Sequence, residues 1–77
     1  MFKFNILDMP AFLKAVNECS GKVNIIQENG YKSNINKQWS IQSALKERFR
    51  ENHNSLKVIL SIPDYKDYLR VVHCLIS

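Results

Sequence analysis

The residues of this chain best suited to chemistry include a pair of aspartates near its end. Asp64 and Asp67 lie three positions apart, a spacing that places two carboxylates on one side of a helix. Such a pair could act in acid–base catalysis or hold a metal ion. A helix cap at Asp64 and a surface ion pair between Asp67 and Arg70 account for both residues without any chemistry. We therefore expect no catalytic role for this pair.

The histidines and cysteines are also spaced without a recognisable catalytic or metal-binding pattern. His53 falls in a polar turn, and His73 lies in the last predicted helix, where we expect a partly buried side chain with one hydrogen bond. Cys19 and Cys74 lack Cys-x-x-Cys spacing and occupy apolar helix faces, which indicates buried reduced thiols. The sequence thus predicts no enzyme, no cofactor and no metal ion.

The first elements predicted from the sequence are a strand and a helix. Apolar and polar residues alternate over positions 2–6, as in a strand with one buried face. Asp8 suits the N-cap of a helix, and Pro10 fits its first turn, where a missing N–H is tolerated. Apolar residues then recur at helical spacing, and we expect Gly21 to end this helix.

Three further strands and two further helices complete the chain. Asn29-Gly30 between extended runs indicates a tight hairpin. A helix is predicted from Ser40, whose hydroxyl is expected to cap it. The nearly continuous apolar run at 56–62 predicts a central strand covered on both faces or nearly so, and Pro63 and Asp64 open a last helix. At 77 residues, one domain spanning 1–77 with the order βαββαβα is expected.

Charge and hydropathy indicate which partners and which cellular location to expect. The formal net charge is +4, but the lysines are scattered, and Lys46, Arg48 and Arg50 alternate with Glu47 and Glu51. This pattern does not favour nucleic acid as a partner. The N-terminal apolar run breaks before Pro10, too early for a signal peptide or a membrane span. We expect a cytoplasmic protein that does not enter a membrane.

The order of elements resembles the histidine-containing phosphocarrier (HPr) family of the bacterial sugar phosphotransferase system. The resemblance spans nearly the whole chain and rests locally on four segments: Phe12-Leu13-Lys14-Ala15, Asn29-Gly30, Ile35-Asn36 leading into Ser40-Ile41, and Asp64-Tyr65-Lys66-Asp67. It implies an α/β (α+β) fold, an open-faced β-sandwich with a four-stranded antiparallel sheet and helices packed on one face.

The chain departs from this family where the family carries its phosphate. The phosphohistidine lies just before the first helix, in a His-x-Arg-Pro type segment. Matching Phe12-Leu13 to the family's apolar pair places the histidine's position near Asn5 to Asp8, with no histidine there; matching Pro10 to the family's proline places Leu7 at the histidine. Asp8 as N-cap would also repel a phosphate. The resemblance therefore implies a degenerate member without its phosphohistidine.

Ser40 is the second position to which the resemblance draws attention. Some HPr-like proteins carry a serine at the start of the second helix that a kinase phosphorylates, and Trp39-Ser40-Ile41 occupies that place here. Tryptophan replaces the basic residue of the family's segment. We expect helix capping to explain this serine, with regulatory phosphorylation as the alternative.

A surface for another protein is expected around the first and second helices. Its candidate residues are Trp39, Ile41 and Leu45. We expect Trp39 to cover the core as a lid, with a protein contact as the alternative, and Tyr31, Tyr65 and Tyr68 to belong mostly to the core.

Together these features predict a protein-binding or regulatory module without phosphocarrier activity, whose partner is a component or regulator of the phosphotransferase system. The first alternative is an active phosphocarrier or a Ser-phosphorylated regulator of sugar transport. The second alternative is a small ferredoxin-like module that binds a ligand or nucleic acid.

Overall fold

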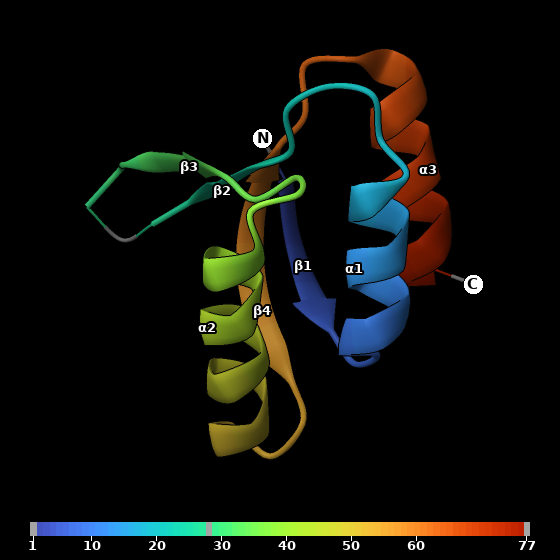
Figure 1. The fold of residues 1–77 in the computed structure, drawn as a ribbon. Helices are drawn as coiled ribbons and strands as arrows, with labels where there is room; N and C mark the ends of the chain where they lie inside the picture. Colours follow the sequence, from blue (N-terminus) through green and yellow to red (C-terminus); the bar gives the residue numbers. More distant parts are fainter. Residues whose placement is uncertain (1, 28, 77) are drawn as a thin grey trace.

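The computed structural model describes residues 2–27 and 29–76, and its elements follow the predicted order. They are β1 (Phe2–Ile6), α1 (Met9–Asn17), β2 (Asn24–Ile26), β3 (Lys32–Asn34), α2 (Trp39–Glu51), β4 (Leu56–Ser61) and α3 (Tyr65–Ile76). Figure 1 shows α1 beside α3, with α2 on the other side of α1. The predicted βαββαβα order is confirmed.

The strands form one antiparallel sheet in the order β1-β4-β2-β3. β4 is a central strand, as expected, with β1 on one side and β2 on the other. The expectation that both of its faces are covered is wrong. Its residues alternate, so that Val58 is buried while Lys57 is exposed. An alternating strand has one covered face and one face open to solvent.

The hydrophobic core fills the space between this covered face and the helices. All three described helices contribute to it, with Phe12 from α1, Leu45 from α2 and Val71 from α3. These residues pack with Ile6 and Leu60 from the sheet. Because every described helix packs into one core, the helices lie on the same face, and the expected open-faced arrangement is confirmed.

The start of α1 follows from its sequence, but its end does not. The Asp8 carboxylate accepts the N–H of Ala11 at 3.1 Å, and Pro10 lies in the first turn, so both predictions are confirmed. The helix ends at Asn17 with Glu18 as its C-cap, which means that Gly21 lies beyond the helix end and does not cap it.

The hairpin forms around Asn29-Gly30 as predicted, with shorter strands. Gly30 has a φ of 83°, which glycine adopts without the steric cost of a side chain. The N–H of Gln27 donates to the carbonyl of Tyr31 at 2.9 Å, so the two strands continue to pair toward the turn. Tyr31 is exposed, which corrects its expected place in the core.

The second helix begins earlier than predicted. α2 starts at Trp39, Gln38 is its N-cap, and no side chain bonds to the free N–H groups there. Ser40 is therefore the second helical residue and is exposed. The expectation that its hydroxyl caps the helix is wrong.

The last helix presents a different face to the core than its sequence indicates. Asp67, expected at the surface beside Arg70, is only 2% exposed, and Val71 is fully buried. Tyr65, expected in the core, is exposed instead, and Leu69 is exposed as well. Asp67 is buried where its carboxylate accepts hydrogen bonds from the backbone N–H groups of the segment that follows α1. Asp64 keeps its predicted capping role, since it accepts the N–H of Lys66 at 2.9 Å.

Candidate functional site

The main candidate site is a groove between α1 and α2, which run side by side in opposite directions (Figure 1). Its volume is about 630 Å³. We call it the α1–α2 groove, and ten residues line it: Met9, Pro10, Leu13, Lys14, Asn17, Trp39, Gln42, Lys46, Phe49 and Arg50.

The groove combines an apolar floor with one exposed aromatic residue. Met9 and Leu13 are buried, and Phe49 is half-buried, so the floor is continuous with the core. Trp39 is 63% exposed at the start of α2. The expectation that it covers the core as a lid is therefore wrong. An indole left in solvent beside an apolar groove is a typical anchor for a protein contact.

The charges around the groove are basic. Lys14 lines it from α1, and Lys46 and Arg50 line it from α2. No carboxylate is found among the lining residues in the described part of the chain. Arg50 also forms an exposed ion pair with Glu47 at 2.5 Å, a contact that solvent and salt weaken. The groove thus offers positive charge next to apolar surface.

Buried amides hold the two walls of the groove at one end. The Gln42 amide nitrogen donates to Asn17 Oδ1 at 2.7 Å and to the carbonyl of Ile35 at 2.8 Å. Asn17 Nδ2 in turn donates to Gln42 Oε1 at 3.3 Å. Gln42 is buried, and a buried amide with its partners satisfied specifies one arrangement of the elements it joins. This network fixes the end of α1 to the first turns of α2.

Two more side chains form hydrogen bonds with backbone groups of the segment that follows α1. Asn36 Nδ2 donates to the carbonyls of Cys19 and Gly21, at 3.0 and 2.6 Å. The Asp67 carboxylate accepts the N–H groups of Ser20 and Gly21, at 3.1 and 2.9 Å. The bond from Gly21 lowers the pKa of Asp67, although burial opposes it.

Cys19 lies in the same cluster as a buried thiol. Its Sγ donates to the carbonyl of Ala15 at 3.3 Å. Burial, followed by the nearby Asp67 carboxylate, raises the pKa of Cys19 to about 11. Cys19 is therefore buried as predicted, while Cys74 is only half-buried.

At the N-terminus of α1, residues of the chain itself bond to or remove the free N–H groups. The Asp8 side chain accepts one helix N–H, and Pro10 has no N–H to offer. His53 lies in the turn after α2, and His73 lies in α3, where it is exposed and not partly buried as expected. The segment Asn5 to Asp8, where the family's phosphohistidine would fall, presents no phosphoryl acceptor of that kind.

The three residues predicted for a partner surface do not form one surface. Trp39 lines the α1–α2 groove, whereas Ile41 and Leu45 lie on the other side of α2. Leu45 is only 4% exposed and belongs to the core, so it does not share an exposed surface with Trp39. Ile41 is half-buried against the same core. Ser40 is exposed on the side of Ile41, away from the α1–α2 groove.

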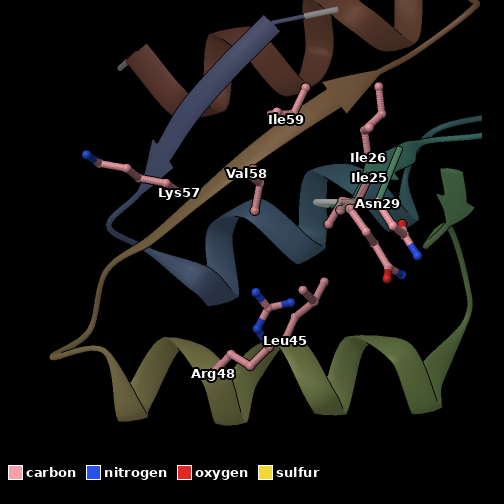
Figure 2. Close-up of a pocket in the computed structure, with 9 residues that line it drawn as sticks. Ile25, Ile26, Asn29, Leu45, Arg48, Lys57, Val58 and Ile59 are labelled. Carbon is pink, nitrogen blue, oxygen red and sulfur yellow. The ribbon is translucent and has the colours of Figure 1, made fainter. Parts of the chain in front are cut away.

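A second groove lies on that other side of α2, beneath the β2–β3 hairpin. Its larger part has a volume of about 550 Å³ and lies between α2, β4 and the end of β2 (Figure 2). An adjoining cavity of about 330 Å³ shares Ile25, Gln27, Leu45 and Arg48 with it. We call the two together the hairpin groove.

Most residues of the α1–α2 groove are not predicted from the sequence, although α2 carries a signal for them. Trp39, Gln42, Lys46 and Phe49 follow each other at intervals of three, four and three residues, which places them on one helix face. The pattern was hidden because only Trp39 and Phe49 are apolar. Lys14 gives no such signal, because a single lysine on an outer helix face is common.

No family model, curated protein or solved structure matches this chain significantly. Within residues 2–27 and 29–76, no three His, Cys, Asp or Glu side chains come together in a way that could hold a metal ion. The helices of the same ranges lack the length and apolarity that crossing a bilayer requires.

Proposed function

We propose that this chain is an HPr-like module without phosphocarrier activity, which binds another protein in the α1–α2 groove and is not an enzyme. One observation carries the proposal: Trp39 is 63% exposed at the end of an apolar groove that is bordered by Lys14, Lys46 and Arg50. We also propose a cytoplasmic location, and the resemblance to the phosphotransferase family makes a component or regulator of that system the expected partner.

The residues that line the α1–α2 groove indicate which kind of partner surface would fit it. Apolar side chains such as Leu13 and Phe49 favour an apolar anchor, and tryptophan beside such a pocket is typical of interface hot spots. Three cations around the rim favour carboxylates, which would speed association and select the orientation of the partner. We infer a partner segment that presents acidic residues on either side of an apolar one.

The loss of phosphoryl transfer is supported by the N-terminus of α1. A helix N-terminus binds phosphate through free N–H groups and the positive end of its dipole. Here the Asp8 carboxylate already accepts the N–H of Ala11 and adds negative charge, while Pro10 removes one donor. A phosphate would meet repulsion and fewer donors at this place.

Intact-protein mass spectrometry tests the absence of transfer. The protein is incubated with phosphoenolpyruvate and the general phosphotransferase enzyme, with a working HPr as the positive control. We expect the control to gain one phosphoryl group while this chain keeps its mass. A phosphohistidine adduct on this chain would overturn the proposal.

Phosphorylation of Ser40 is a second candidate function, favoured by the exposure of its side chain in the first turn of α2. The positive end of the helix dipole tolerates a phosphate there. Incubation with ATP and the kinase that modifies HPr-like proteins would then add one phosphoryl group, and Ser40→Ala would remain unmodified. An unchanged mass for the wild-type chain would exclude this function.

A further inference from the structure

The hairpin groove contains an unpaired strand edge. β4 pairs with β1 along Leu56–Leu60, but with β2 only along Ile59–Ser61. Within the described strands, Leu56–Val58 therefore has a partner on one side alone. Its other side faces the cavity between the hairpin and α2 (Figure 2). An open strand edge presents N–H and C=O groups that can pair with another extended chain.

The edge is open because β2 leaves the sheet early. After Ile26 the chain turns away with the hairpin, where the N–H of Gln27 bonds to the carbonyl of Tyr31. The open stretch, Leu56–Val58, is about 10 Å long at the usual rise of a strand. It can pair with roughly three residues of a peptide that continues the line of β2.

The side chains around the edge suit an extended peptide with alternating residues. Val58 points toward α2, and Leu45 and Arg48 rise from α2 toward it, whereas Lys57 points away from Arg48 (Figure 2). One side of a bound strand would thus contact the apolar Val58 and Leu45. Arg48 stands at the same cavity with no carboxylate among its described lining residues.

We propose that the hairpin groove binds an extended acidic segment of a partner protein, which adds a strand to β4 along Leu56–Val58. Main-chain hydrogen bonds to β4 would hold the segment, and Arg48 would pair with one of its carboxylates. A second copy of this chain fits less well, because its own Arg48 and Lys57 would come to the same edge with like charge. This site is separate from the α1–α2 groove.

Nuclear magnetic resonance titration of the full chain tests the proposal. The probe is a blocked pentapeptide of alternating glutamate and valine, and its lysine–valine counterpart is the charge control. We expect the glutamate peptide to shift the backbone amide signals of Leu56–Val58, with a Kd of about 1 mM or tighter. The lysine peptide should leave these signals in place.

N-methylation of the peptide separates strand addition from simple charge attraction. Two methylated versions block alternate sets of its N–H groups, and only one set can face β4. We expect one version to lose binding while the other keeps it. Equal binding by both versions would overturn the strand addition.

Substitutions in the protein test the role of Arg48. Arg48→Glu should raise the Kd of the glutamate peptide by about tenfold, and Arg48→Gln should raise it by a smaller factor. Lys66→Glu makes the same charge change on α3 and should alter the Kd by less than about twofold. The dispersion of the amide spectrum shows that each variant is folded.

Two further results would contradict the proposal: amide shifts elsewhere in the chain without any at Leu56–Val58, or no shifts at millimolar peptide. Trp39→Ala keeps this test distinct from the proposed function, because it removes the anchor of the α1–α2 groove. It should leave the affinity for the glutamate peptide unchanged.

Discussion

The Asp67 carboxylate in α3 accepts the backbone N–H of Gly21, 46 positions earlier in the chain, at 2.9 Å. Its other oxygen accepts the N–H of Ser20 at 3.1 Å. The carbonyl of Gly21 in turn accepts a hydrogen bond from Asn36. One carboxylate therefore joins α3 to the segment that leads out of α1, and through Asn36 to the segment before α2. This connection supports one wall of the α1–α2 groove.

Replacing Asp67 should destabilise the fold. Asp67→Ala leaves two backbone N–H groups without their acceptor, and we expect the free energy of unfolding to fall by about 2–4 kcal/mol. Asp67→Asn keeps one acceptor oxygen and should cost about 1–3 kcal/mol. Urea unfolding followed by circular dichroism measures both values. Glu51→Gln, at an exposed position, should change stability by less than about 0.5 kcal/mol. A similarly small change at Asp67 would contradict the role described.

The same carboxylate should make stability depend on acid pH. The N–H of Gly21 holds the pKa of Asp67 below its ordinary value of 3.8. The unfolded chain then takes up the proton first, so this contribution is complete above pH 3.8 and disappears as pH falls through the lower folded pKa. The difference in unfolding free energy between wild type and Asp67→Asn should therefore shrink between about pH 5 and pH 2. A difference that stays constant over this window would show that the charge of Asp67 does not matter.

Cys19 should resist modification in the folded protein. Burial raises its pKa to about 11, so little of the thiol is ionised at pH 8, and the residue is only 1% exposed. We expect a thiol reagent to label Cys19 at the rate of global unfolding, and Cys74, which is half-buried, to react first. Peptide mapping of partly labelled protein identifies the order. Early labelling of Cys19 would mean that the α1–α3 contact opens locally.

Truncation should lower the free energy of unfolding much more at Leu45 than at Trp39. Leu45→Ala removes buried contacts and should lower the free energy of unfolding by about 2–4 kcal/mol. Trp39→Ala removes a mostly exposed side chain and should cost less than about 1 kcal/mol. Chemical denaturation of both variants provides the comparison. A large loss of stability for Trp39→Ala would return this residue to the role of a lid over the core.

Much of the fold follows from local sequence. Asp8 and Pro10 specify where α1 begins, Asn29-Gly30 specifies the hairpin, and the apolar run at 56–62 contains the central strand. Each depends on residues close together in the chain, where backbone preferences act directly.

The rest of the fold depends on contacts between distant segments. The buried face of α3 could not be predicted from the sequence. It includes Asp67, whose carboxylate bonds to the backbone N–H groups of Ser20 and Gly21, far away in the chain. An aspartate three positions before Arg70 looks like half of a surface pair in sequence alone. The apolar residues of α3 do not mark its buried face either, since Tyr65 and Leu69 are exposed.

The candidate site was predicted only in part. The sequence predicts Trp39 as a candidate residue of the partner surface. The other wall of its groove comes from α1, and only folding brings Lys14 and Leu13 opposite it. The sequence predicts Leu45 on the same surface as Trp39. The two residues face different sides of α2, and the buried Gln42 on the side of Trp39 is bonded to Asn17 and to the carbonyl of Ile35.

Site-specific photo-crosslinking tests the central claim, binding in the α1–α2 groove, most directly. Benzoylphenylalanine replaces Lys46 in the groove or, as the matched control, Lys66 on α3, and each protein is irradiated in lysate of its own organism. We expect one discrete crosslinked product from position 46, none of it from position 66, and its loss on Trp39→Ala. A product formed equally from position 66, a product that survives Trp39→Ala, or the absence of any product from position 46 would contradict the claim.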